Sequence, residues 1–199
     1  MSVEDPIILR WVEETLDGNQ DAFAELVNTY QNAVYNLCYR MLGERTEAED
    51  ATQEAFLRAF LNMDRYDPAR SFKTWVLSIA SNHCIDRLRK RRLTWLSLEE
   101  PLPPNINLRS DEPEPEQAAI HDERSQAVQA LLNNLSTEYR AAVILRYWYD
   151  YSYAEIADIL DTTESAIKSR LFRARQALAD RIDTQSPNGT LARPLLESL

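Results

Sequence analysis

Residues 164–180 place side chains that can contact DNA bases on one face of a predicted helix. Four apolar residues, spaced by four, three and four positions, form the opposite face: Ile167, Leu171, Ala174 and Leu178. The exposed face and its flanks carry hydroxyls, cations and one phenylalanine: Ser165, Lys168, Ser169, Phe172, Arg173 and Arg175. Arginine can pair with guanine through two hydrogen bonds, and phenylalanine can cover a thymine methyl group. These residues are typical of a helix that reads the major groove, and a surface helix with solvated charges is the alternative.

A shorter helix is predicted immediately before this one. Ser152 followed by Glu155 forms a capping box, which marks a helix start. The buried side then consists of Ile156, Ala157, Ile159 and Leu160. Residues 161–163, Asp-Thr-Thr, favour a turn. Residues 151–180 therefore read as a helix-turn-helix.

The N-terminal half predicts three more helices. Residues 21–42 are amphipathic, and Gly43 ends the helix. Residues 47–61 form a second helix, with Ala48, Ala55, Phe56, Ala59 and Phe60 on its buried face. Residues 71–92 form a third, which buries Val76, Leu77, Ala80, Cys84 and Leu88 and ends in the basic run RLRKRR.

Two of these helices expose candidate binding residues. On the helix at 47–61 they are Asp50, Gln53, Glu54 and Leu57, which form either a solvated acidic face or a surface that docks on a partner. On the helix at 71–92 they are Trp75, Asn82 and Arg89. A tryptophan and an asparagine beside cations suit single-stranded DNA, because bases stack on the ring and bond through their edges. The alternative is that Trp75 belongs to the core, which the periodicity favours.

Charge and composition divide the chain. The net charge is −10, and residues 96–125 alone hold two basic and eight acidic residues. This stretch includes five prolines and no apolar periodicity, which indicates an extended acidic linker. We therefore expect an all-α protein with a helical domain at 1–96, a linker at 97–121, a helix-turn-helix domain at 122–183 and a tail at 184–199.

Composition also limits the function. No apolar run reaches the length of a membrane span and no signal peptide is recognisable, so we expect a cytoplasmic protein. Cys38 and Cys84 lack metal-ligand or redox spacing and lie among apolar residues, which predicts buried free thiols. No motif for a metal, a cofactor or catalysis is recognisable.

Three blocks of sequence resemble the extracytoplasmic-function group of bacterial sigma factors. They are DATQEAFLRAF at 50–60, SFKTWVLSIASNHCIDRLRKRR at 71–92 and the helix-turn-helix at 151–180. The resemblance covers about residues 20–95 and 123–183. It implies two helical domains and a non-enzymatic promoter-specificity subunit, which binds core RNA polymerase and promoter DNA and is commonly restrained by an anti-sigma factor.

The resemblance also implies roles for particular residues. Asp50, Gln53, Glu54 and Leu57 fall on the family's clamp-binding helix. Asn82 and the loop 62–71 fall where −10 bases are captured, and the linker would run through the RNA path of the polymerase. Lys168, Ser169, Phe172 and Arg173 fall on the −35 recognition surface, where the family often has Gly-Thr in place of Ser165-Ala166.

Two other function classes remain as alternatives. A stand-alone helix-turn-helix regulator would bind DNA tightly by itself, usually as a dimer on a palindrome. Residues 126–199 hold eight basic and nine acidic residues, which disfavours tight binding that depends on phosphate neutralisation. A nucleic-acid enzyme would need a carboxylate cluster, a phosphate-binding loop or a metal set.

Overall fold

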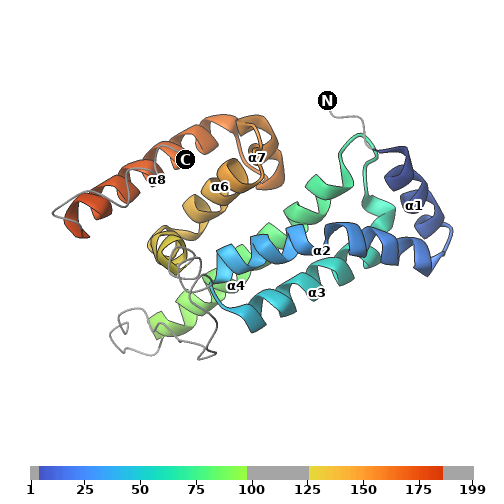
Figure 1. Ribbon diagram of the computed structural model, residues 1–199, viewed down its shortest axis with the longest axis horizontal. Helices are drawn as coiled ribbons and strands as arrows, with labels where there is room; N and C mark the ends of the chain where they lie inside the picture. The colour runs from blue at the N-terminus through green and yellow to red at the C-terminus, as the bar shows by residue number, and fades with distance from the viewer. Residues whose placement is uncertain (1–4, 98–125, 186–199) are drawn as a thin grey trace, which may run out of the picture.

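The computed structural model describes residues 5–97 and 126–185, which form helices joined by short turns (Figure 1). The first lobe contains α1 (Pro6–Leu16), α2 (Gln20–Leu42), α3 (Arg45–Leu61), the short 3-10 helix η1 (Met63–Arg65) and α4 (Phe72–Ser97). The second lobe contains a helical segment at 126–133, α6 (Thr137–Trp148), α7 (Tyr153–Ile159) and α8 (Glu164–Gln185). The all-α prediction is confirmed. The predicted linker beyond residue 97 and the tail beyond residue 185 lie outside the described residues.

The ends of α2 are set by the two residues that flank it. The Asn19 side chain accepts a hydrogen bond from the Asp21 N–H at 3.0 Å, which satisfies one of the free donors of the first turn. Gly43 ends the helix in the left-handed region, with φ of +80°, and donates its N–H to the Tyr39 carbonyl. The predicted stop at Gly43 is therefore confirmed, and glycine adopts this conformation without steric strain.

α3 and α4 follow the predicted helices closely. α3 begins two residues before the predicted start, because the Glu44 side chain accepts hydrogen bonds from the Thr46 and Glu47 N–H groups. The Ser71 hydroxyl accepts from the Thr74 N–H at 3.1 Å at the start of α4. Cys38 of α2 and Cys84 of α4 are both free and buried in the core of this lobe, as predicted.

α1, α6 and the helical segment at 126–133 were not predicted from the sequence. α1 begins at Pro6, where the Asp5 carboxylate caps the Ile7 N–H at 2.9 Å, and it buries Ile8 and Val12 against the rest of the lobe. α6 is buried over an unbroken run from Arg140 to Leu145, so its apolar residues surround the helix instead of forming one stripe.

The helix-turn-helix is confirmed in detail. Ser152 and Glu155 form the predicted capping box at the start of α7, with the Ser152 N–H donating to the Glu155 carboxylate at 2.8 Å. The turn passes through Asp161, whose φ is +46°. α8 then packs on α6 and α7 through the four predicted apolar residues Ile167, Leu171, Ala174 and Leu178, all of which are buried.

The two lobes pack against each other. α6 contacts both α2 and α4, and α7 contacts α4, so the buried residues of both lobes form one continuous cluster. Figure 1 shows α6 between α8 and the first lobe. The second lobe therefore meets the first through α6 and α7, while α8 lies farther out.

The capping box generates a test of this local geometry. Ser152→Ala removes the acceptor for the Glu155 N–H and one end of the reciprocal pair. We expect the free energy of unfolding to fall by about 1 kcal/mol, measured by urea denaturation. Ser165→Ala is the control, because Ser165 is exposed within α8, and it should change stability by less than about 0.5 kcal/mol. An equal loss in both variants would contradict the role of the cap.

Candidate nucleic-acid interface

One face of α8 is exposed to solvent. Ile167, Leu171 and Ala174 point into the core of the second lobe. The residues predicted to contact DNA are all exposed: Ser165, Lys168, Ser169, Phe172, Arg173 and Arg175. Phe172 is 63% exposed. A phenylalanine ring held in solvent at the centre of this surface, between cations and hydroxyls, fits apolar contact with a base.

Two arginines on this surface are oriented by weak local contacts. Arg173 lies within 3.5 Å of the Tyr139 hydroxyl of α6, which supports the side chain from the adjacent helix. The Arg175 Nε donates to the Leu171 carbonyl at 3.4 Å, so its side chain lies back along α8. The Arg173 side chain therefore extends from the exposed face of α8, whereas the Arg175 side chain lies at the edge of that face.

A second exposed surface lies on α3. Asp50, Gln53 and Leu57 are exposed, and Glu54 is partly exposed and pairs with Arg58 at 2.6 Å. Phe60 was predicted to be buried, but it is 39% exposed and contacts Phe23 with one side of its ring. Leu57 and Leu61 are 53% and 67% exposed. Leu61 was not a predicted candidate, because its spacing does not distinguish it from the other apolar residues of the helix. Together with Leu57 and Phe60 it adds an apolar strip to the acidic surface.

The three candidates on α4 lie in different environments. Asn82 and Arg89 are exposed. Trp75 is only 9% exposed and packs against Tyr66 and Phe72, with ring centroids 5.2 and 5.6 Å away. The ring therefore belongs to the core, which is the alternative that the periodicity favours, and it does not face outward beside Asn82 as a stacking surface for a base would. Tyr66 in the loop before α4 covers it, and its hydroxyl donates to the Arg70 carbonyl at 2.6 Å.

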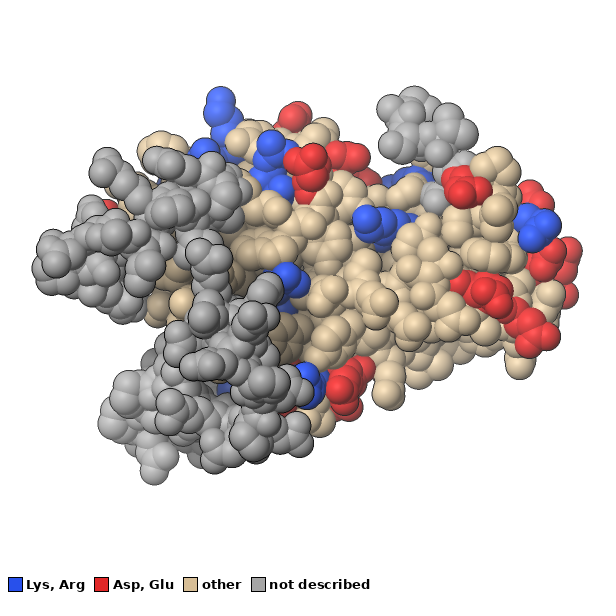
Figure 2. All heavy atoms as spheres, in the orientation of Figure 1, with Lys and Arg blue, Asp and Glu red and all other residues tan. Residues whose placement is uncertain are grey.

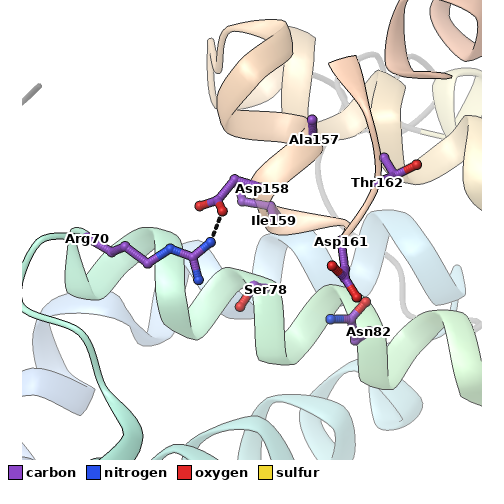
Figure 3. Close-up of a pocket in the computed structure, with 8 residues that line it drawn as sticks. All are labelled: Arg70, Ser78, Asn82, Ala157, Asp158, Ile159, Asp161 and Thr162. Carbon is purple, nitrogen blue, oxygen red and sulfur yellow. Dashed lines mark ion pairs between the residues drawn. The ribbon is translucent and has the colours of Figure 1, made fainter. Parts of the chain in front are cut away.

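A polar cavity of about 300 Å³ lies between α4 and α7 (Figure 3). Arg70, Ser78 and Asn82 line it from the first lobe, and Asp158, Asp161 and Thr162 are among the residues from the second. Arg70 forms an ion pair with Asp158, and Figure 3 shows Asn82 and Asp161 facing each other. The structure thus brings Asn82 against the second lobe, which the sequence did not predict.

Most arginines in the basic run of α4 are paired with carboxylates. Arg87 lies near Glu47 and Asp50 of α3, and Arg91 lies near Glu47. Arg89 donates to Glu138 of α6 at 2.8 Å, and this hydrogen bond lowers the pKa of Glu138. Figure 2 shows acidic side chains at the α1 end of the first lobe and a further group on the second lobe around α7.

The described part of the chain shows neither a metal-binding cluster nor a membrane span. Within residues 5–97 and 126–185, no three His, Cys, Asp or Glu side chains are grouped so that they could hold a metal ion. In the same ranges, no helix has both the length and the apolar character required to cross a membrane.

Two sequence families match the chain in the order of its lobes. Sigma-70 region 2 matches residues 26–94, and Sigma-70, region 4 matches residues 125–178. α1 precedes the first match, and the second covers α6, α7 and most of α8. Each surface described above therefore lies within a matched region.

Individual proteins are similar over most of the chain. The ECF RNA polymerase sigma factor SigW of Bacillus subtilis is 38% identical over 181 residues, which is 88% of this chain and 97% of SigW. The solved structure of CnrH in complex with the cytosolic domain of CnrY aligns with a TM-score of 0.66 at 25% identity, over 90% of this chain and 99% of that one. The sigma factor RpoE in complex with the anti-sigma factor NepR, from Bartonella quintana, aligns with a TM-score of 0.63 at 22% identity, over 82% and 98% of the two chains, and shows the same fold.

Proposed function

The chain belongs to the extracytoplasmic-function group of the bacterial sigma-70 family, and we propose that its two lobes divide promoter recognition between them. It is a promoter-specificity subunit of RNA polymerase, so it confers recognition of DNA while the polymerase carries out the chemistry. This proposal is supported by the match of regions 2 and 4 to separate lobes, each of which has its own exposed surface.

The second lobe reads the −35 element as duplex DNA. Its support is the outward face of α8, where Phe172 and Arg173 lie at the centre and Lys168 and Arg175 at the sides. The central side chains contact base edges in the major groove, and the lateral cations contact phosphates. Ser165 and Ser169 add hydroxyls that can bond to either.

The first lobe captures bases of the −10 element after they unstack. Asn82 supplies donors and acceptors for the edge of an extruded base, and Arg89 supplies a cation for the adjoining phosphates. Because Trp75 is buried, its part in this proposal is to support the loop at 62–71 through contacts with Tyr66 and Phe72. A base could stack on Trp75 only after this loop moved.

Core RNA polymerase binds the surface of α3. Asp50, Gln53 and Glu54 provide polar and acidic contacts, and Leu57 provides an exposed apolar one that Phe60 and Leu61 extend. An apolar strip bordered by charges is the usual composition of a protein interface. The linker at 97–121 connects this docked lobe with the −35 reader through the RNA path of the polymerase.

The same proposal covers the remaining roles. The domains are 1–96, with polymerase docking and −10 recognition, and 122–183, with −35 recognition. The chain acts in the cytoplasm beside RNA polymerase, requires no cofactor and catalyses no reaction itself. An anti-sigma factor is a further partner, which is supported by the similarity in fold to a sigma factor solved with one.

Run-off transcription tests the proposed function directly. Purified chain and bacterial core polymerase are combined with a pool of promoter templates, and transcripts are compared with those of core polymerase alone. We expect defined start sites that depend on the chain. If no template gives such a transcript, although the chain is folded, the proposal is wrong.

Charge reversal on α3 tests the docking surface. Asp50→Arg with Glu54→Arg should weaken binding to core polymerase at least tenfold, about 1.4 kcal/mol, because both carboxylates lie off the buried face. Binding is measured by fluorescence anisotropy, and helix content by circular dichroism.

The matched control reverses two carboxylates of α1. Glu13→Arg with Glu14→Arg makes the same change in charge in the same lobe, and Glu14 has an i,i+4 arginine partner just as Glu54 has. We expect near-normal polymerase binding from this control. Equal losses in the two double variants would show that charge alone, and not the α3 surface, determines affinity.

Two single substitutions on α8 separate base reading from phosphate contact. Arg173→Ala should cost about 1–3 kcal/mol at one base pair and relax preference there. Arg175→Ala should weaken binding to all sequences alike and reduce the salt slope by about one. Affinities are measured with the holoenzyme on a series of −35 base substitutions at two salt concentrations. A uniform loss for Arg173→Ala, with base preference unchanged, would place the reading face elsewhere on α8.

A further inference from the structure

We propose that Tyr139 of α6 is a positioning residue for base reading by Arg173 of α8 at the −35 element. Its hydroxyl holds the guanidinium in the orientation that meets a base edge, and Tyr139 itself does not touch DNA. This inference rests on the proposed function of α8 as the −35 reader. It adds to that function a specificity-determining residue that lies outside the recognition helix.

The start of α6 fixes the position of Tyr139. Ser136 caps this helix, and its hydroxyl accepts a hydrogen bond from the Tyr139 N–H at 3.4 Å. The tyrosine ring is partly buried and packs against the core. Tyrosine has few rotatable side-chain bonds, so a capped backbone and a packed ring hold the hydroxyl at a defined point beside α8.

This hydroxyl contacts the arginine at the centre of the exposed face. The Arg173 Nη1 donates to the Tyr139 hydroxyl at 3.5 Å. Within residues 5–97 and 126–185, no carboxylate lies within ion-pair distance of Arg173. The guanidinium is therefore oriented by a neutral group that comes from the adjacent helix.

A neutral hydroxyl orients an arginine without neutralising its charge. A guanidinium has several N–H donors, so those that Tyr139 does not use remain for the O6 and N7 atoms of a guanine. Arg70 and Arg89 differ in this respect, because each is paired with a carboxylate that a DNA phosphate would have to displace. Arg173 can bind a base while it keeps its contact with Tyr139.

Orientation matters because an arginine side chain is long and mobile. Ordering such a side chain at an interface costs conformational entropy, and a contact that orders it beforehand reduces this cost. A bidentate pair needs two acceptors at the correct places on the base edge. A guanidinium that is already oriented therefore favours the matching base more than other bases, so the contact increases discrimination more than general affinity.

The contact lies entirely within the second lobe. α6 packs directly on α8, and the match to Sigma-70, region 4 at residues 125–178 includes both Tyr139 and Arg173. The contact does not depend on how the two lobes are arranged. It is therefore available when the chain is bound to polymerase on promoter DNA.

The test removes only the hydroxyl, by Tyr139→Phe. Affinity of the holoenzyme is measured on the promoter duplex that gives the strongest run-off transcript and on its −35 base substitutions. At the base pair that Arg173 reads, we expect discrimination to fall about three- to fivefold, a small effect because the hydrogen bond is exposed and 3.5 Å long. Discrimination at the other −35 positions should not change, whereas a general loosening of the lobe would alter it. The salt slope should also be unchanged, because no cation is removed.

Tyr147→Phe is the matched control. It makes the same substitution on the same helix, at a tyrosine that is also partly exposed. No hydrogen bond joins Tyr147 to Arg173 in the described part of the chain. We expect wild-type discrimination from this variant. Equal losses in the two variants would overturn the proposal, since they would show a general effect of altering α6.

A double-mutant cycle with Arg173→Ala separates positioning from direct contact with DNA. If Tyr139 acts through Arg173, then Tyr139→Phe should have no further effect once Arg173 has been replaced. An equal loss of affinity from Tyr139→Phe with and without Arg173 would mean that the tyrosine contacts DNA itself, and the positioning role would be wrong.

The Arg173→Ala variant alone keeps this inference separate from the proposed function. If this variant relaxes base preference while Tyr139→Phe discriminates as the wild-type chain does, only the role of Tyr139 is wrong. If Arg173→Ala leaves base preference unchanged, the reading face of α8 has been assigned incorrectly and the positioning role fails with it.

Discussion

The C-terminal end of α2 is the point on which the arrangement of the molecule depends. Three successive carbonyls near this end accept from different donors: Tyr39 from the Gly43 N–H, Arg40 from Gln129 and Met41 from Arg140. Gly43 makes this possible in two ways. Its φ of +80° reverses the chain, and a Cβ in its place would lie 3.2 Å from the Gln129 side chain. The two lobes can thus approach closely at this point because Gly43 has no side chain.

This anchor determines which surfaces face solvent. α6 carries Arg140 on the side toward the first lobe and packs α8 on another side. A helix that is buried on two sides does not show a single apolar stripe. The helix at 137–148 could therefore not be predicted from the spacing of its apolar residues. α8 packs on the far side of α6 from the first lobe and buries only one face. The outward face of α8 is therefore exposed, because α6 lies between α8 and the first lobe.

The buried positions of a helix could be predicted best from the sequence where the helix buries only one face. The apolar positions of α8 and the capping box of α7 were all correct, because periodicity and a local hydrogen-bond motif determine them. α4 was predicted less well, since it contacts α2 and α3 on one side and the second lobe on another. The periodicity of α4 favours a core position for Trp75, but the contact of its ring with Tyr66, nine positions away in the preceding loop, could not be predicted from helical spacing.

The pairing of charges is compatible with DNA binding by an acidic chain. The chain has 22 basic and 32 acidic residues, and Arg87, Arg89 and Arg91 of the basic run each lie beside a carboxylate. Exposed ion pairs contribute only about 0–1 kcal/mol each, so they can be exchanged for phosphates at little cost. A cation held by an exchangeable carboxylate attracts DNA weakly at long range but remains available at short range. Binding then requires that another molecule bring promoter and protein together, and the sigma subunit meets that requirement when polymerase is its partner.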